Sequence, residues 1–261
     1  MTGPDPRATA IIPARLGSER FPRKVLASET GTPLIVHVCH AAARASLVER
    51  VVVGAGETEI VEAVEAAGFE ARLTDAGHES GTSRVAEVAD QLGLPLDALV
   101  VNVQGDEPEI EPGVIDAAIK ALAASNAPVA TVASEIRQDE DASNPNIVKV
   151  VTDRFGEALM FSRAPIPHDR DGKGAVRRLR HVGIYAYRRW FLRDLQGLQP
   201  TPLERAERLE QLRFMEHGHR IAVAEHASTG AGIDTPEQYR AFVQRFARDR
   251  DSHAVQQGHK G

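Results

Sequence analysis

The chain has 261 residues, of which 42% are hydrophobic and 26% charged, proportions typical of a folded globular protein and unlike those of disordered or fibrous chains. Lysine and arginine together number 31, aspartate and glutamate 37, and the net charge is therefore −6 at pH 7. This balance excludes a general basic field for nucleic acid or anionic lipid, so any anionic ligand needs a local cluster of cations.

Membrane insertion and secretion are not indicated. No apolar run approaches the roughly 18 residues of a membrane helix, and the first ten residues, MTGPDPRATA, lack the apolar core of a signal peptide. We therefore expect a cytoplasmic protein without a membrane partner. The single cysteine, Cys39, has no internal disulfide partner and lies in the apolar run PLIVHVCHAAARA, where a buried structural thiol is favoured over a nucleophile.

Strands and helices alternate along the first half of the chain. Strands are predicted over 8–14, 50–55, 69–74 and 97–104, and helices over 33–46, 58–68, 82–93 and 112–125. Such alternation is typical of a parallel sheet with helices on both faces. We therefore predict an α/β fold with a Rossmann-like, mixed but mainly parallel sheet.

The alternation of strands and helices stops after a further strand over 128–134. Strands over 146–153, 158–163 and 180–187 follow without comparable helices, which indicates an antiparallel excursion over about 135–190 that supplies substrate or dimer contacts. Helices over 190–198 and 202–218, a strand over 220–226 and a helix from Thr235, its N-cap, complete the pattern. We expect one domain over 8–248, with flexible tails at 1–7 and 249–261.

A basic loop, PARLGSERFPRK over residues 13–24, follows the first strand. Its cations are Arg15, Arg20, Arg23 and Lys24. In doubly wound sheets ligands bind beyond the carboxyl ends of the strands, so a triphosphate would meet this loop. The loop is neither GxGxxG nor GxxxxGK[ST], which disfavours a dehydrogenase or a kinase. A solvated basic loop is the alternative.

Another polar segment, VVNVQGDEPEI, ends the strand over 97–104. Its Asp106 is delivered to the same edge of the sheet as the basic loop. A carboxylate beside phosphates indicates a bridging Mg²⁺, because this ion binds one or two carboxylates together with phosphate oxygens. Taken alone, an aspartate after a strand is more often a turn or a helix cap.

Several motifs together resemble one enzyme family, and the resemblance runs from about Ala10 to Phe246. They are IIPAR, HESGTSRVAEV, VNVQGDEP, NPNIVKVV, FSRAPIPHDRD, RHVGIYAYR, TPLERAERLEQLR and GIDTPE, in the family's order. The chain resembles the 3-deoxy-manno-octulosonate cytidylyltransferases, or CMP-Kdo synthetases, which couple CTP to the acidic sugar Kdo for lipopolysaccharide synthesis. The resemblance implies the nucleotide-diphospho-sugar transferase type of sheet, Mg²⁺ as cofactor and a homodimer.

The resemblance also implies roles for individual residues. It places CTP against Pro13, Ala14, Arg15, Lys24, Arg84 and Asp106. It makes Arg15, Lys24, Asp106 and Asp234 catalytic, with Asp106 and Asp234 as the magnesium ligands. It surrounds the sugar acid with Gln104, Arg163, His181, Tyr185, Glu210 and Gln211. In the implied reaction the C2 hydroxyl of Kdo attacks the α-phosphorus of CTP in line and displaces pyrophosphate.

The side-chain types suit the implied ligands, but most of these residues also have an ordinary structural interpretation. Arg163 is a suitable forked donor for the Kdo carboxylate. His181 and Tyr185 share a strand face and could be a half-buried core pair. Glu210, with Gln211 after it, lies in a charged helical run where a solvated face is the default, and Asp234 could cap a helix.

Two departures from the family pattern and two other functions stay open. Arg23 stands where the family more often has glycine, and Ala55 and Gly56 stand where many relatives carry Thr-Asp. The acid sugar could instead be an amino-Kdo or of the sialic acid type. A non-catalytic nucleotide-binding relative is the other class, although neither the metal carboxylates nor the basic loop is missing.

Overall fold

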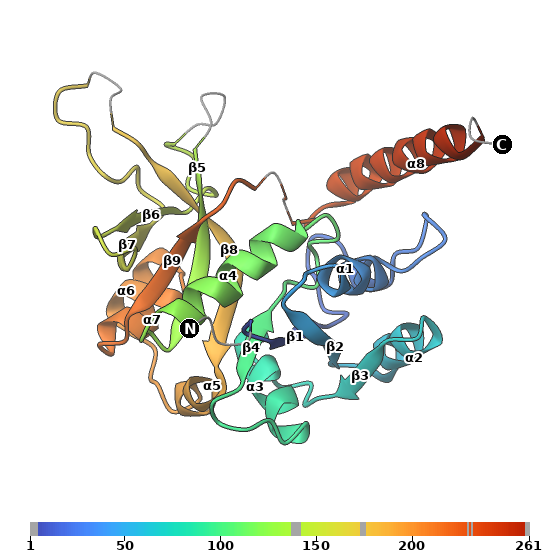
Figure 1. Ribbon diagram of the computed structural model, residues 1–261, viewed down its shortest axis with the longest axis horizontal. Coiled ribbons are helices and arrows are strands. Elements are labelled where there is room, and N and C mark those ends of the chain that lie inside the picture. The colour runs from blue at the N-terminus through green and yellow to red at the C-terminus, as the bar shows by residue number, and fades with distance from the viewer. Residues whose placement is uncertain (1–4, 137–141, 173–175, 229, 231, 259–261) are drawn as a thin grey trace.

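The computed structural model describes residues 5–136, 142–172, 176–228, 230 and 232–258 (Figure 1). The strands are β1 Ala8–Ala14, β2 Val48–Ala55, β3 Glu70–Leu73, β4 Leu99–Asn102, β5 Val129–Glu135, β6 Lys149–Thr152, β7 Ala158–Ser162, β8 Leu179–Arg188 and β9 Ile221–Glu225. The helices are α1 Leu34–Ala43, α2 Thr58–Ala66, α3 Gly81–Gln91, α4 Pro112–Ala124, α5 Arg189–Leu195, α6 Pro202–Glu207, α7 Gln211–Glu216 and α8 Pro236–Gly258, with a 3₁₀ turn η1 Lys24–Leu26.

The main sheet has the strand order β3-β2-β1-β4-β8-β5-β9. The pairs β3–β2, β2–β1, β1–β4 and β5–β9 are parallel, whereas β8 runs antiparallel to both β4 and β5. The predicted mixed, mainly parallel α/β sheet is therefore confirmed. Because the carboxyl ends of β1 and β4 are neighbours, the loops that follow them meet at one edge.

Helices cover both faces of the sheet, as the alternation predicts (Figure 1). Ala10 and Ile12 of β1 pack in a core with residues of α1, α2 and α4, whereas Ile11 points into the opposite core with residues of α3, α5 and α7. Each buried aliphatic side chain stabilises the fold by roughly 1.5–3 kcal/mol. Cys39 is buried in the first core, which raises the pKa of its thiol to about 12, so the thiol is structural as expected.

The excursion over 135–190 differs in part from the prediction. Its antiparallel character is confirmed, since β6 pairs antiparallel with β7 and β8, and Gly156 turns between β6 and β7 with φ +78°. However, β8 is a central strand of the main sheet and not part of a separate projection. Residues 173–175 of the excursion lie outside the described residues.

The predicted helix over 202–218 is divided. Arg208 adopts a left-handed conformation with φ 53°, which ends α6 and starts a turn before α7. The two short helices are joined by Arg213, whose Nε donates to Glu204 Oε2 at 2.8 Å. The sequence predicted Glu210 in the middle of a charged helix. In the structure it stands at the N-cap of α7.

The last helix begins where the sequence predicts and extends further. Thr235 Oγ1 accepts from the Gln238 amide at 3.3 Å, and Pro236 is the first residue of α8. Tyr239 and Phe242 pack against Leu34 at the start of α1. The tail expected from residue 249 is helical as far as Gly258, because α8 continues to that residue and projects from the body (Figure 1).

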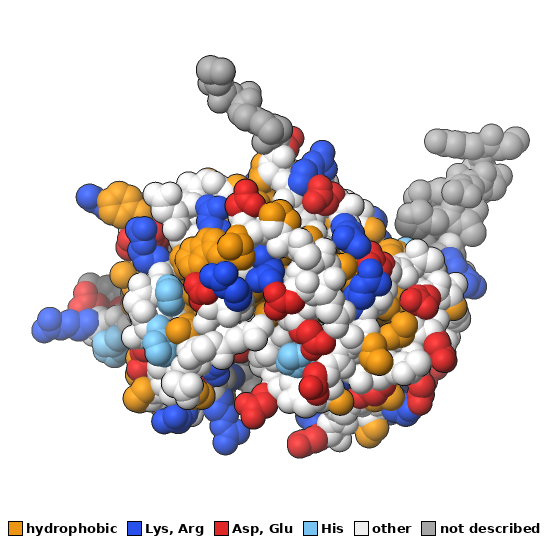
Figure 2. Space-filling model, turned by 90° about the horizontal axis from the view of Figure 1, so that it is seen from below, with side chains coloured by type: hydrophobic (Ala, Val, Ile, Leu, Met, Phe, Trp, Pro, Cys, Tyr) orange, Lys and Arg blue, Asp and Glu red, His pale blue; other side chains and the backbone are white. Residues whose placement is uncertain are grey.

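The surface charge and the character of the helices bear on which classes of partner the protein can have. Figure 2 shows basic and acidic side chains interspersed over the face seen from below. Of the helices in the described part of the chain, none combines the length and apolar character that crossing a membrane requires.

Arg23 gives a test of the backbone shape of the basic loop. It adopts φ 60°, a left-handed conformation that favours glycine, and its guanidinium forms an exposed ion pair with Glu59. We expect Arg23→Gly to raise the Tm by about 2 °C in thermal unfolding, because glycine adopts this φ without steric conflict. Glu59→Gln, the control, removes only the ion pair; an Arg23→Gly protein less stable than this control contradicts the account.

Candidate functional site

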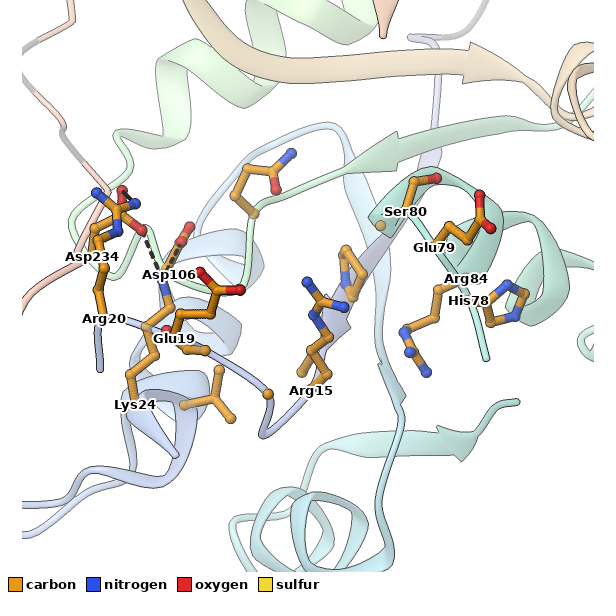
Figure 3. Close-up of a pocket in the computed structure, with 18 residues that line it drawn as sticks. Arg15, Glu19, Arg20, Lys24, His78, Glu79, Ser80, Arg84, Asp106 and Asp234 are labelled. Atoms are coloured by element: carbon orange, nitrogen blue, oxygen red, sulfur yellow. Dashed lines mark hydrogen bonds and ion pairs between the residues drawn. The ribbon is translucent and has the colours of Figure 1, made fainter. Parts of the chain in front are cut away.

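A cavity of about 490 Å³ lies where β1 and β4 end (Figure 3). The basic loop forms one side of it, and the start of α3, the end of β4 and the segment before α8 form the others. Its lining residues are Pro13, Ala14, Arg15, Gly17, Ser18, Glu19, Arg20, Lys24, Val25, His78, Glu79, Ser80, Gly81, Arg84, Gln104, Gly105, Asp106 and Asp234. All six residues predicted to bind nucleotide are among them.

Close backbone contact holds these segments together. A Cβ on Gly105 would lie 2.6 Å from the main-chain oxygen of Pro13, so only glycine fits at this crossing. On the other side of Pro13, a Cβ on Gly81 would lie 3.2 Å from the proline ring. The Ile233 amide donates to the Asp106 carbonyl at 2.8 Å, which attaches the segment before α8 to the end of β4.

An ionic cluster stands at one end of the cavity. The Lys24 ammonium donates to Asp106 Oδ2 at 2.7 Å, to Asp234 Oδ1 at 3.1 Å and to the Ile233 carbonyl at 2.8 Å (Figure 3). Arg20 pairs with the other oxygen of Asp234 at 2.9 Å. Three residues predicted to be catalytic are thus brought together, and Arg20 joins them although the sequence assigned it no partner.

The oxygens around Lys24 fit a hard divalent cation. Two carboxylates and one main-chain carbonyl converge on a single ammonium, and these are the ligand types that Mg²⁺ takes. Among the described residues there is no group of three or more His, Cys, Asp and Glu side chains placed to hold a metal. Such a site needs further oxygens from a ligand, as magnesium sites with phosphates usually do.

Two further cations line the cavity. Arg15 is exposed and reaches into its middle, and no ion pair joins it to a carboxylate of the described residues (Figure 3). Arg84 is buried and donates to Thr74 Oγ1 and, at 3.3 Å, to the Asp75 carbonyl. Burial lowers the pKa of Arg84, because desolvation disfavours its charge. An anionic ligand is therefore favoured on this side of the cavity as well.

The departure at Ala55 and Gly56 has a structural consequence. A Cβ on Gly56 would come within 3.2 Å of Nη1 of Arg84, so the glycine lets the guanidinium lie against the backbone. The nearby Glu57 accepts from the Leu16 amide at 3.0 Å and thereby holds the start of the basic loop. The carboxylate at 57 therefore orients the loop and does not form an ion pair with Arg84.

Of the residues predicted to surround the sugar acid, several gather on β8 and at the start of α7. The rings of His181 and Tyr185 are 5.3 Å apart. The Tyr185 hydroxyl and the Gln211 amide nitrogen are buried without a hydrogen-bond partner among the described residues. Glu210 accepts from Thr82 Oγ1 at 2.6 Å. Burial raises the pKa of Tyr185, with smaller contributions from Tyr187 and Glu210. Buried polar atoms without partners suit the binding of a polyhydroxy ligand.

Gln104 connects this group to the cavity. It lines the cavity and donates to the Gly183 carbonyl at 3.2 Å, where the pairing of β5 with β8 shifts register between Thr131 and Val132. A second cavity of about 420 Å³ shares His78, Glu79 and Ser80 with the first and is lined also by Glu210. Gln104 and Glu210, two of the predicted sugar residues, therefore line two cavities that adjoin at the start of α3.

Arg163 is placed differently from the other predicted sugar residues. Its guanidinium donates to the carbonyls of Glu207 at 2.7 Å, Pro145 at 2.9 Å and Arg208 at 3.4 Å. Like His181, Tyr185 and Gln211 it lines neither of the two cavities, but its contacts hold the turn between α6 and α7. These contacts engage one N–H on each of its three nitrogens, and its predicted role in binding the carboxylate stays a prediction.

Sequence reasoning missed Glu107, which follows Asp106 directly. Burial, reinforced by Asp106 and Glu111, raises the pKa of its carboxyl to about 7, and the nearby Arg180 opposes the shift. Sequence reasoning also missed Thr82, the donor to Glu210. The QGDEP motif, with adjacent carboxylates after a strand, was a signal for Glu107, whereas nothing in the sequence joins Thr82 to Glu210.

Comparison with known proteins identifies close relatives. The family model described as "Cytidylyltransferase" matches residues 9–221. The 3-deoxy-manno-octulosonate cytidylyltransferase of Geobacter metallireducens is 45% identical over 253 residues, covering 93% of this chain and 98% of the relative. That of Anaeromyxobacter sp. Fw109-5 is 49% identical over 231 residues, covering 88% and 93%.

Solved structures agree with the sequence matches. A CMP:2-keto-3-deoxy-manno-octonic acid synthetase complexed with CTP superposes with a TM-score of 0.87 at 40% identity, covering 93% of this chain and 99% of that one. A 4-diphosphocytidyl-2C-methyl-D-erythritol synthase, with a TM-score of 0.61 and 12% identity over 92% and 97% of the two chains, shows the same fold.

The partly buried imidazole of His181 gives a test by pH. Thr131 donates to the Ile184 carbonyl at 2.6 Å, so its oxygen accepts from Nε2 of His181 at 2.9 Å. Burial lowers the pKa of His181 from 6.5 to about 4. The unfolded chain then takes up a proton that the folded chain does not, and stability is lost as pH falls from 6.5 to 4.

His181→Gln lacks this titration. In denaturant unfolding we expect the wild type to lose up to about 1.4 kcal/mol more per pH unit than the variant across that range. Groups that titrate in both proteins cancel in the difference. Parallel stability curves for the two proteins would show that His181 is not held neutral by the fold.

Proposed function

Since the chain belongs to the family of 3-deoxy-manno-octulosonate cytidylyltransferases, we propose that it transfers CMP from CTP to Kdo and releases pyrophosphate. The product, CMP-Kdo, serves lipopolysaccharide synthesis. The observation that carries the proposal is the convergence of Lys24, Asp106 and Asp234 at the edge of the sheet that also presents Arg15. The solved relative named as a complex with CTP supports the choice of nucleotide.

In the proposed reaction the C2 hydroxyl oxygen of Kdo forms a bond with the α-phosphorus of CTP. The bond between that phosphorus and the oxygen bridging to the β-phosphate breaks, and the hydroxyl proton is released. The chain contributes positioning and charge, since no covalent enzyme intermediate is needed. Arg15 and Lys24 neutralise the triphosphate, and Arg84 lies behind them at the start of α3.

Asp106 and Asp234 would hold Mg²⁺, with the Ile233 carbonyl directed at the same point. When bound, such an ion stabilises the negative charge that develops on the phosphates. Arg20 keeps Asp234 oriented through the oxygen that Lys24 does not use.

The sugar acid would lie between β8 and the start of α7, next to the α-phosphate. Tyr185 and Gln211 offer unpartnered polar atoms there, and His181, held neutral, supports the ring of Tyr185. Glu210 can accept from sugar hydroxyls while Thr82 fixes its orientation. These assignments explain why a polyhydroxy acid sugar would be preferred to a simple alcohol.

We propose further that the protein is a homodimer in the cytoplasm and that the excursion forms the dimer contact. Phe155 and Leu159, on the turn and strand of the β6–β7 hairpin, expose 74% and 59% of their surface. Among the described strands β7 pairs only with β6, which leaves a strand edge beside these side chains. Large exposed apolar side chains at a free edge are typical of an interface.

The activity is tested by pyrophosphate release from the purified chain with CTP, Kdo and Mg²⁺, beside ATP in place of CTP and N-acetylneuraminate in place of Kdo. We expect release with CTP and Kdo only. Activity with another acid sugar alone would overturn the choice of substrate. CTP binding without release would identify a nucleotide-binding relative that has lost catalysis.

In the same assay we expect Asp106→Asn to lower kcat by at least about a hundredfold, because it removes a carboxylate proposed to hold the metal. Asp97→Asn, an exposed aspartate before β4, is the matched control and should retain activity. Equal activity of the two variants would remove Asp106 from the reaction centre.

The dimer is tested by introducing charge. We expect Phe155→Glu to convert the dimer to a monomer in sedimentation or light scattering, because a carboxylate cannot be buried unpaired in an apolar interface. Leu73→Glu is the control, since Leu73 is 53% exposed at the other edge of the sheet, on β3. An unchanged dimer of Phe155→Glu, or equal dissociation by both variants, contradicts this interface.

A further inference from the structure

The Lys24 ammonium already occupies the point on which the proposed metal ligands converge. It contacts one oxygen of Asp106, one of Asp234 and the Ile233 carbonyl, all within 3.1 Å. Only 12% of its side-chain surface is exposed, against 29% for Asp106 and 43% for Asp234, so water reaches the carboxylates but hardly the ammonium. Lys24 therefore acts as the cation of this site.

An ammonium and a divalent cation cannot share this point. Each would take oxygens of Asp106 and Asp234 as direct partners, which would bring the two positive ions within a few ångströms of each other. Like charges at such a separation repel even where solvent screens them in part. A metal ion can enter only if Lys24 withdraws.

The place to which Lys24 can withdraw is the cavity. Lys24 lines it together with Arg15 and Arg20, and the loop that carries Lys24 borders it (Figure 3). A lysine side chain is a point charge on a flexible stem and can change partner without loss of its charge. Phosphate oxygens in the cavity would replace the carboxylates that Lys24 releases.

We propose that Lys24 is a displaceable internal counter-ion, which holds Asp106 and Asp234 together and competes with the divalent cation for them. This inference rests on the proposed function, because that proposal makes the two aspartates metal ligands. It assigns Lys24 an action before phosphate binding, in which it weakens metal binding to the protein alone. Metal and nucleotide then favour each other, since the phosphates accept the charge that the metal displaces.

The test measures Mn²⁺ binding without nucleotide or sugar, by the electron paramagnetic resonance signal of free Mn²⁺. We expect Lys24→Met to bind Mn²⁺ about tenfold more tightly than the wild type, because the competing cation is gone. Lys24→Arg keeps the charge and should bind as weakly as the wild type. Lys120→Met removes a lysine exposed on α4 and is the control for net charge.

The outcomes separate this inference from the proposal on which it rests. A gain in Lys24→Met that disappears when Asp106→Asn is added supports it. Binding by Lys24→Met equal to or weaker than that of the wild type overturns it, whether or not the enzyme makes CMP-Kdo. Binding that does not depend on Asp106 overturns the magnesium site and this inference together.

Two further measurements cover the case of a poorly folded variant. Lys24→Gln keeps a donor for Asp106 without the charge, and we expect the same tighter binding from it. Thermal unfolding with and without Mn²⁺ gives an independent readout, because a ligand raises the Tm more when it binds the folded state more tightly. A larger rise for the wild type than for both neutral variants contradicts the inference.

Discussion

The contact of one ammonium with two carboxylates organises the candidate site. Lys24 lies 82 residues from Asp106 and 210 residues from Asp234 along the chain, yet a single ion cluster holds all three. Removing the lysine would leave Asp106 without its cation and Asp234 with Arg20 alone, and removing a carboxylate would leave a largely buried ammonium with fewer partners. The cluster therefore determines how the basic loop, the end of β4 and the segment before α8 meet.

The rest of the fold supports this meeting point. Gly105 permits the crossing of the loops after β1 and β4, where any side chain would strike the Pro13 carbonyl. Packing of Tyr239 and Phe242 on Leu34 anchors α8, and with it the preceding Asp234. On the other side β8, inserted between β4 and β5, brings Tyr185 beside the end of β4. Nucleotide and sugar groups therefore approach from different elements toward the same edge.

Most of the fold could be predicted from the sequence, because the apolar periods of the first half are clear and short loops join them. The central position of β8 could not, since strand order depends on pairing between residues that are distant in the chain. The break between α6 and α7 was hidden because Arg208, a good helix former, adopts a conformation usually taken by glycine. Likewise the end of α8 was missed because its last residues have no apolar period.

In the site, too, positions next to predicted elements could be predicted, whereas contacts between distant segments could not. The sequence placed Asp106 and the loop of Lys24 at one edge, because each follows a predicted strand, whereas Asp234 was joined to them only by the resemblance. The sequence could not show that Arg163 is engaged with the main-chain carbonyls of the α6–α7 turn, or that Thr82 orients Glu210. Such contacts depend on which loops the tertiary fold brings together, and the type and spacing of residues do not encode them in readable form.

The most direct test of the account is a crystal structure with CTP and Mn²⁺, in which anomalous scattering locates the metal. The account predicts a metal peak between Asp106 and Asp234, with the Lys24 ammonium moved from these carboxylates onto the phosphates. A metal bound elsewhere, or Lys24 still bridging the two aspartates with CTP in place, would contradict it.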